Sequence, residues 1–411
     1  MDTRTLAPGS ASGSVPTPDR ARGRRRPARA AALLALAVGA GTLLTACGDD
    51  QPYSTVSPRS DSASDIQGLY TLLFWTATVV FVLVQGFIVY TALKFQRRNE
   101  NQIGRPEQIH GNRRAEIAWT AIPAVVLLVI FIPTAQVLYD HAEAAEAADI
   151  EIDVYGNQWW WEFHYPEGDE YGGIITANEL RLPLGKEVVF NLRSNNVIHS
   201  FWVPQLSGKM DVIPGRNNRL SFKADRPGEY WGSCAEFCGT AHAWMRFRII
   251  VEPQEQFDGW MQAWQAPPPL TDPNLETADV VEAPAAFGVC LLCHNITGTN
   301  AQIAEAGLLA NPYGTQHGPN LTLYGCRDTI AAGVLGNTRE NLATWLKETD
   351  EVKPGTYMPN YYKQGQINDQ QVDELVEYLF SLQPAGGCPV DPPTGGDIET
   401  TDAVDPVAAV P

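Results

Sequence analysis

Cysteine, histidine and methionine residues occur in one short loop of the chain at a spacing that suits metal binding. Cys234, Cys238, His242 and Met245 lie within twelve residues, and His199 lies further upstream. Soft thiolate and thioether ligands combined with imidazole select copper, and two thiolates four residues apart can bridge two copper ions that share one electron. The set predicts a copper electron-transfer centre. For the two cysteines alone, a disulfide or a redox dithiol outside the cytoplasm is the alternative.

A second motif, Cys290-Leu291-Leu292-Cys293-His294, is typical of c-type haem attachment. Its two thiols form thioethers with the haem vinyl groups, and the adjacent histidine ligates the iron. A zinc knuckle would need a second ligand pair downstream, and a thioredoxin-type dithiol would need a strand, a turn and a helix around it. Met358 is the only methionine after Met261 and is the expected sixth ligand, because His/Met ligation raises the reduction potential. His317 is the competing ligand.

Distinct elements are expected to position these two motifs. Short alternating or β-branched runs separated by Pro-Gly and Asn-Asn turns predict a small antiparallel β-sandwich or barrel over residues 150–252. Residues 285–385 combine the haem motif with helical patterns and predict a mostly α domain. A Pro-rich acidic linker at residues 265–284 should stay extended, and the composition of residues 386–411 predicts a disordered tail.

Two apolar stretches, residues 69–93 and 117–138, are each long enough to cross a bilayer as a helix. They predict a transmembrane hairpin over residues 69–140. Six basic residues lie around the turn between them, and the positive-inside rule places that turn in the cytoplasm. The N-terminus and everything after about residue 140 are therefore expected outside the membrane. Glu116, at the cytoplasmic mouth of the second helix, is either an interfacial charge or a proton-path group.

The N-terminus has the layout of a secretory signal peptide, with an Arg-rich stretch followed by an uncharged apolar run at residues 30–44. Leu44-Thr45-Ala46-Cys47 resembles a bacterial lipoprotein cleavage box. Residues 1–46 are therefore the expected signal peptide, residues 47–68 an external segment, and Cys47 a lipid anchor. An uncleaved signal anchor is the alternative.

Charge and cysteine content exclude several classes of protein. The 411 residues carry a formal net charge of -18, although seven of the 29 basic residues crowd the first thirty positions. Such an acidic chain lacks the cations that nucleic-acid binding requires. Seven cysteines are too few for a disulfide scaffold. Cys326 and Cys388, which belong to neither motif, could form one disulfide outside the cytoplasm or remain idle thiols.

Several motifs carry a resemblance to subunit II of haem-copper cytochrome c oxidases, over roughly 190 residues from the first apolar helix to Val251. The resemblance implies a dinuclear CuA centre bridged by Cys234 and Cys238. It rests on Glu116-Ile117-Ala118-Trp119-Thr120-Ala121-Ile122-Pro123, Gly156-Asn157-Gln158-Trp159-Trp160-Trp161, the His199 segment, Ile213-Pro214-Gly215-Arg216 and the loop from Cys234 to Met245.

The same resemblance assigns the other copper ligands. It implies that His199 and His242 are terminal ligands, that Met245 is a weak ligand, and that Glu236 supplies its backbone carbonyl. The family also uses the Glu236 side chain at a magnesium site shared with subunit I, with Asp211 nearby.

Trp159 matches the aromatic residue through which electrons reach the copper in that family. Since side chains alternate along a strand, three consecutive tryptophans cannot all face one core, and at least one is expected to be exposed. Simple packing is the alternative role. Glu116 matches the family's glutamate at the mouth of a proton-uptake path. Where the family often has an acidic residue before Val-x-His-Ser, this chain has Asn196, which puts in doubt an acidic docking patch for a separate basic cytochrome c.

The C-terminal domain is similar to class I cytochromes c, in which a loop like His317-Gly318-Pro319-Asn320-Leu321 lies against the haem. The predicted fold is thus a two-helix transmembrane hairpin, an all-β cupredoxin-like sandwich and an all-α cytochrome c domain. The predicted function is the electron-accepting subunit of a caa-type, proton-translocating cytochrome c oxidase of a bacterial cytoplasmic membrane, with oxygen reduced in subunit I. Expected partners are subunits I and III, membrane lipid, and an external donor such as cytochrome c or a cytochrome bc-type complex.

Two other functions would use part of the same features. A copper metallochaperone would use the two thiols and one histidine but would not explain Met245, the tryptophan run or the haem motif. A free-standing periplasmic electron-transfer lipoprotein would explain both motifs but would have no oxidase subunits as partners.

Overall fold

A computed structural model describes most of the chain. The residues described are 52–95, 110–144, 146, 148–168, 171–265, 283–294, 296, 318–384 and 387–388. The predicted signal peptide, the lipid anchor at Cys47, most of the linker, His317 and nearly all of the predicted tail lie outside these residues.

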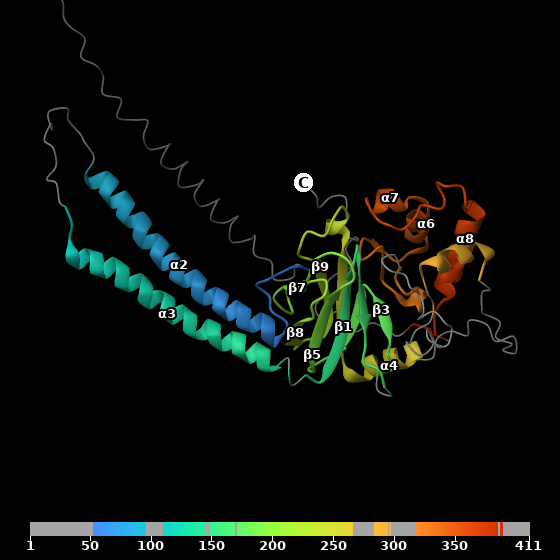
Figure 1. The fold of residues 1–411 in the computed structure, drawn as a ribbon, viewed down its shortest axis with the longest axis horizontal. Coiled ribbons are helices and arrows are strands. Elements are labelled where there is room, and N and C mark those ends of the chain that lie inside the picture. The colour runs from blue at the N-terminus through green and yellow to red at the C-terminus, as the bar shows by residue number, and fades with distance from the viewer. Residues whose placement is uncertain are drawn as a thin grey trace, which may run out of the picture. The chain divides into compact units, whose positions relative to one another are not determined.

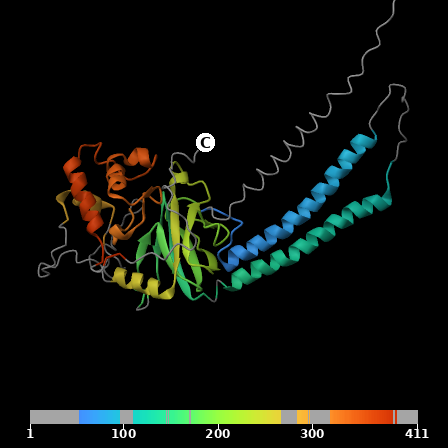
Figure 2. The same cartoon turned by 180° about the vertical axis from the view of Figure 1, so that it is seen from behind.

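Two long helices form the first part of the described chain, α2 (Asp61–Lys94) and α3 (Arg113–Ala144). They run side by side in both views (Figures 1 and 2). Ser60 caps α2 by accepting a hydrogen bond from the backbone N–H of Ala63. Their apolar side chains are exposed, as for Phe81 at 63% and Leu127 at 67%, which suits contact with lipid. Both helices are long and apolar enough to cross a membrane, and the predicted hairpin is confirmed.

Ten strands form a two-sheet sandwich after the helices. One sheet has the strand order β3-β2-β1-β5-β8 and the other β4-β10-β9-β6-β7. Large apolar side chains from both sheets, among them Trp161, Phe190 and Phe247, are fully buried between them. The strands are β1 (Ile150–Asn157), β2 (Trp160–His164), β3 (Ile175–Ala177), β4 (Glu179–Pro183), β5 (Glu187–Ser194), β6 (His199–Trp202), β7 (Met210–Val212), β8 (Asn218–Lys223), β9 (Gly228–Cys234) and β10 (Arg246–Glu252).

The expectation of a purely antiparallel sandwich is wrong in two places. β1 pairs with β5 in parallel, with Val154 opposite Leu192, and β10 pairs with β4 in parallel, with Ile250 opposite Arg181. Parallel neighbours cannot be joined by a tight hairpin, so each pair needs a long connection through other strands. Strand patterns in the sequence do not carry that information about partners.

Helix α4 (Gln254–Gln265) follows the last strand and lies against the sandwich. Phe257, Trp260 and Trp264 are buried on its inner face, and the Trp260 and Tyr165 rings lie 5.3 Å apart. This aromatic face anchors the chain at the end of the sandwich, ahead of the C-terminal domain.

The C-terminal domain is mainly helical, as predicted. Helix α8 (Asp369–Ser381) begins at a capping box in which Asn368 and Gln371 bond each other's backbone N–H groups. A disulfide joins Cys326 to Cys388, which resolves the two alternatives for this pair. The elements are the 3-10 helices η2 (Ala285–Leu292) and η4 (Tyr324–Cys326), the short strands β11 (Thr329–Ile330) and β12 (Leu335–Gly336), and helices α6 (Arg339–Lys347), α7 (Thr349–Val352) and α8 (Asp369–Ser381).

Candidate functional site

The cysteine, histidine and methionine residues of the copper motif meet at one end of the sandwich. Cys234 is the last residue of β9, and His199 is the first of β6, which pairs with β9. His242 opens the 3-10 helix η1 (His242–Trp244), and Met245 directly precedes β10. Three elements of one sheet and the loop between β9 and β10 therefore bring the motif together.

The distances between the ligand atoms are short. The Cys234 and Cys238 Sγ atoms lie 3.7 Å apart, His199 Nδ1 is 3.9 Å from Cys234 Sγ, and His242 Nδ1 is 3.6 Å from Cys238 Sγ. Met245 Sδ is 3.8 Å from Cys238 Sγ. Each sulfur thus has one imidazole beside it, which is the arrangement that two sulfur-bridged metal ions require.

A backbone carbonyl oxygen lies beside the sulfur atoms, and a side-chain amide orients one of the histidines. The Glu236 backbone carbonyl oxygen lies 3.2 Å from Cys234 Sγ. His199 Nε2 donates to Asn196 Oδ1 at 2.9 Å, which leaves Nδ1 directed at the sulfur. His199, both cysteines and Met245 are buried. This donor set of two thiols, two imidazoles, a thioether and a carbonyl fits a pair of copper ions.

The two thiols differ in acidity. The neighbouring Cys238 thiol lowers the pKa of Cys234, whereas the pairing with Cys234 and burial raise the pKa of Cys238. Cys234 is therefore the more acidic of the two thiols, and the thiolate is the form that binds a metal.

The three consecutive tryptophans are all buried, so the expectation that at least one is exposed is wrong. Trp161 points into the sandwich core, as the alternation of side chains requires. Trp160 packs with Ala332 of the C-terminal domain, and the Trp159 ring lies 4.8 Å from the ring of Tyr357 in the same domain. The C-terminal domain covers the face that the sequence analysis left to solvent.

Trp159 also contacts the copper loop. Its indole Nε1 donates to the Cys238 carbonyl oxygen at 3.1 Å, and Gln158 Nε2 donates to the same oxygen at 2.8 Å. Trp159, the residue expected to conduct electrons to the copper, therefore holds the backbone of Cys238, one of the predicted ligands.

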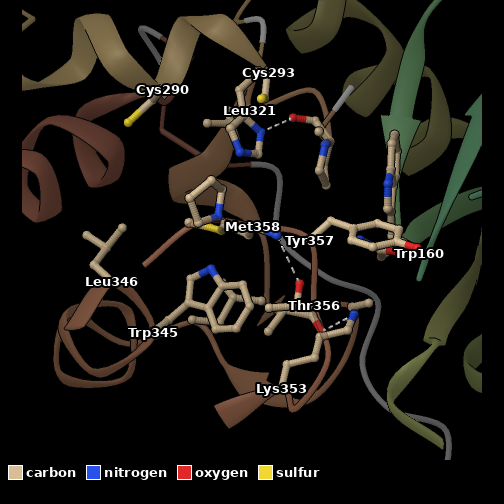
Figure 3. A pocket seen from close by; sticks show the side chains of 18 of the residues that line it. Trp160, Cys290, Cys293, Leu321, Trp345, Leu346, Lys353, Thr356, Tyr357 and Met358 are labelled. Atoms are coloured by element: carbon tan, nitrogen blue, oxygen red, sulfur yellow. Dashed lines mark hydrogen bonds between the residues drawn. The ribbon is translucent and has the colours of Figure 1, made fainter. Parts of the chain in front are cut away.

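The haem motif lines a cavity of about 450 Å³ that lies between the C-terminal domain and the sandwich, whose Gln158, Trp159 and Asn196 also border it. Cys290, Cys293 and His294 border it together with Met358, and Figure 3 shows the Met358 segment beside this cavity. His294 Nδ1 donates to the Pro319 carbonyl oxygen at 2.7 Å, which fixes the orientation of the imidazole ring.

Packing around this histidine leaves no room for a larger neighbour. A Cβ at Gly318 would lie 2.6 Å from the His294 ring. Buried apolar residues such as Leu342 and Trp345 complete the walls. The size of the cavity, its apolar lining and the presence of both an imidazole and a thioether in it fit a covalently bound haem.

Glu116 lies apart from both sites, in the first turn of α3. Its Oε1 atom accepts a hydrogen bond from the Asn112 backbone at 3.1 Å. Its role in a proton path stays a prediction.

Three residues near the sites were missed by the sequence analysis. Asn196 was read only as a missing acidic group, although its side chain holds His199. Tyr357 and Lys353 reach the Trp159 region from the other domain, where Lys353 Nζ donates to the Trp159 carbonyl oxygen at 2.6 Å. Adjacency to Met358 was the only sequence signal for Tyr357.

Comparisons with known proteins agree with this geometry. The family description "Cytochrome C oxidase subunit II, periplasmic domain" matches residues 150–253, the corresponding transmembrane domain matches residues 55–137, and "Cytochrome c" matches residues 280–383.

Relatives match nearly the whole length. "Cytochrome c oxidase subunit 2" of Alkalihalophilus pseudofirmus is 32% identical over 346 residues, and its namesakes from Bacillus sp. strain PS3 and Bacillus subtilis are each 33% identical, over 360 and 356 residues. Each match covers 83% of this chain and 94% of the relative. The sandwich is thus the cupredoxin-like periplasmic domain of this family, and the chain belongs to the cytochrome c oxidase subunit II family, in a form that carries a cytochrome c domain at its C-terminal side.

Proposed function

We propose that this chain is the electron-accepting subunit of a proton-translocating cytochrome c oxidase. Electrons from an external donor would arrive at a c-type haem held by Cys290, Cys293, His294 and Met358. They would pass to a dinuclear copper centre in the sandwich and then to subunit I, where oxygen is reduced to water. Both groups, when bound, exchange single electrons. The observation that carries the proposal is the convergence of two thiols, two imidazoles and a thioether within 4 Å contacts at one end of the sandwich.

The chain's own residues would hold the copper pair rigidly. Cys234 and Cys238 would bridge the ions, and His199 and His242 would each complete one of them. Met245 and the Glu236 carbonyl oxygen would be the weaker ligands. Because both cysteines and Met245 are buried and the Cys238 carbonyl oxygen accepts two hydrogen bonds, the ligands would move little when the charge changes.

The remaining assignments belong to the assembled enzyme. Glu236 and Asp211 are both exposed close to the copper loop, which suits a magnesium ion shared with subunit I. Glu116, at the start of α3, would serve the mouth of a proton path in the same subunit. Subunit III and membrane lipid would complete the surroundings of the hairpin.

The topology would place both redox domains on the periplasmic side of a bacterial cytoplasmic membrane. Residues 1–46 would be a lipoprotein-type signal peptide, and Cys47 would add a lipid anchor on that same side. The external segment would be residues 47–68 and the transmembrane hairpin residues 69–140. The copper domain would be residues 150–252, joined by a linker at 265–284 to the haem domain at 285–385. Residues 386–411 would be the tail.

Purification from membranes in mild detergent tests the function. We expect a mixed-valence dinuclear copper EPR signal, a c-type haem absorption band and co-purifying large subunits. Cys238→Ser should abolish the copper signal and keep the haem band, whereas Met358→Leu should alter the haem spectrum and keep the copper signal. A native preparation without copper, or one that is free of oxidase partners, would contradict the proposal.

A further inference from the structure

The C-terminal domain is bonded to the sandwich through charged and polar groups. Glu179 Oε1 of the sandwich accepts hydrogen bonds from the backbone N–H groups of Asp328 and Thr329, at 3.2 and 3.0 Å, and from the Thr329 hydroxyl at 3.0 Å. Arg248, also of the sandwich, donates to Asp328 Oδ2 at 2.5 Å. One carboxylate and one guanidinium therefore fix a single segment of the other domain.

Arg248 is the buried centre of this contact. Its side chain is 5% exposed and forms ion pairs with Glu179, Glu229 and Asp328. Burial works against its charge, but the three carboxylates outweigh that effect and raise the pKa of Arg248. Because removing one partner from a buried ion pair is costly, this cluster favours one docked pose over a swinging tether.

Apolar and backbone packing supports the same pose. Leu323 of the C-terminal domain lies within the hydrophobic core of the sandwich. Gly355 has a φ of +83°, and a Cβ there would lie 2.3 Å from Thr240 Oγ1 in the copper loop. The backbone just before Met358 therefore touches the loop that carries the copper ligands.

Lys353 bridges the two domains at the tryptophan. Its Nζ donates to the Trp159 carbonyl oxygen at 2.6 Å and to the Ala331 carbonyl oxygen at 3.1 Å. The side chain is buried, so no water competes for these two oxygens. Lys353 fixes the Trp159 backbone relative to the haem domain.

Tyr357 connects the two sites. It directly precedes Met358, and Figure 3 shows its ring pointing from that segment toward the strand that carries Trp160. The Tyr357 hydroxyl donates to Gln158 Oε1 at 3.4 Å, and its ring lies 4.8 Å from that of Trp159 at an interplanar angle of 33°. Trp159 in turn donates to the Cys238 carbonyl oxygen.

We propose that the haem domain is locked on the sandwich in one pose and that Tyr357 is the ring through which the haem-to-copper electron passes, with Lys353 and Asp328 as positioning residues. The proposal rests on the proposed function. When both groups are bound, the haem would supply one electron and the copper pair would accept it, so that one is oxidised and the other reduced by the same amount. No proton moves, and Tyr357 and Trp159 keep their hydrogens. Since the haem domain covers Trp159, an external donor must deliver its electrons to the haem.

Lys353 reports on the pose without any measurement of activity. In the purified whole oxidase we expect an amine-acetylating reagent to modify the half-buried Lys347, whose side chain is 33% exposed, and to leave the buried Lys353 unmodified, as read by peptide mass spectrometry. Asp328→Ala and Gly355→Ala should expose Lys353, whereas Asp373→Ala, on the solvent side of α8, should not. Labelling of Lys353 in the native enzyme at the rate of Lys347 would overturn the locked pose.

Single-turnover kinetics test the conducting ring. After rapid photoreduction of the haem, Tyr357→Leu should slow copper reduction by about tenfold, which corresponds to about 1.4 kcal/mol in the barrier, while Tyr357→Phe keeps nearly the native rate. Haem and copper spectra and reduction potentials should be unchanged in both variants, since Tyr357 is not a ligand. A native rate in Tyr357→Leu would overturn the role of Tyr357. Missing haem or copper signals in the native enzyme would instead contradict the proposed function.

Discussion

Asn196 shows how a single uncharged side chain can tune the copper site. Its Oδ1 accepts the Nε2 proton of His199, and this bond selects the tautomer whose Nδ1 faces Cys234. Such outer partners orient a ligand and raise its basicity. An acidic residue at this position would attract a basic external cytochrome. Because the haem domain covers Trp159, however, an external cytochrome cannot dock there.

Removing that acceptor should weaken copper binding. We expect Asn196→Ala to lower the copper affinity about 10- to 100-fold, the usual loss when the hydrogen-bond partner of a ligating histidine is removed. Competition with a copper chelator, followed by the dinuclear EPR signal, measures the change. The control is Asn195→Ala, since Asn195 bonds Asn157 and not the histidine. Equal affinities of both variants would contradict the role of Asn196.

Sequence reasoning reached the residues that share a loop and missed those that meet across domains. The four side chains predicted as ligands from Cys234 to Met245 are close in sequence, so their types and spacing alone indicate the chemistry. Tyr357 and Lys353 meet Trp159 only because the haem domain docks on the sandwich, and no local periodicity encodes that contact. The buried tryptophans were misjudged for the same reason, since the surface that covers them is a separate domain.

At one position of the sheet that carries the copper loop, the pairing of two strands leaves room only for glycine. Gly232 of β9 lies opposite Phe247 of β10, and a Cβ at Gly232 would lie 2.2 Å from the Phe247 ring. The glycine therefore makes room for a buried aromatic ring directly next to the strand end that presents Cys234. Alternation in the sequence predicted these strands but not which residue faces which.

Gly232→Ala should destabilise the sandwich by about 1–3 kcal/mol, because the added methyl group overpacks the core. Thermal unfolding of the purified protein, with and without copper, measures the loss. Gly259→Ala in α4 is the matched control, since a Cβ there meets nothing within 4 Å. It should be neutral or stabilising by about 0.5–1 kcal/mol, because alanine favours a helix over glycine. An unchanged midpoint in Gly232→Ala would contradict this account.

The disulfide is the element that closes the haem domain. It joins Cys326, at the end of η4, to Cys388, beyond α8, over a sequence separation of 62 residues. Cross-linking such a loop restricts the unfolded chain, so Cys388→Ser should lower the free energy of unfolding of this domain by about 2–4 kcal/mol. Denaturant unfolding followed by the haem band measures it. The double variant with Cys326→Ser should lose no more than the single one; additive losses would contradict a shared bond.

At the scale of the whole molecule, the haem domain is both tethered to the sandwich by the linker and held against it by direct contacts. A flexible linker alone would raise the effective concentration of the haem domain near the copper. The ion pairs of Arg248, the packing of Leu323 and the bridge through Lys353 add a defined orientation. The acidic linker composition could be read from the sequence, whereas the docked orientation depends on pairs of residues from separate domains.

The docked state should become more favourable as the pH rises above neutrality. Burial lowers the pKa of Lys353 to about 7, although the neighbouring Cys238 thiol opposes this effect, whereas an undocked Lys353 would titrate at its ordinary value of 10.5. Between these two values the undocked state binds more protons than the docked state, so docking strengthens with pH in that window. Below about pH 7 both states are protonated, and this contribution no longer changes.

Hydrogen exchange at the Trp159 segment, measured from pH 6 to pH 9 and corrected for intrinsic exchange rates, should therefore show increasing protection in the native oxidase. Lys353→Met removes the titrating group and should flatten the profile, and it should also lower protection throughout because the Trp159 and Ala331 carbonyl oxygens lose their donor. Lys347→Met, which removes a half-buried lysine of the same domain that does not contact the sandwich segment, should keep the native profile. A Lys353→Met profile parallel to the native one would assign the pH dependence to another group.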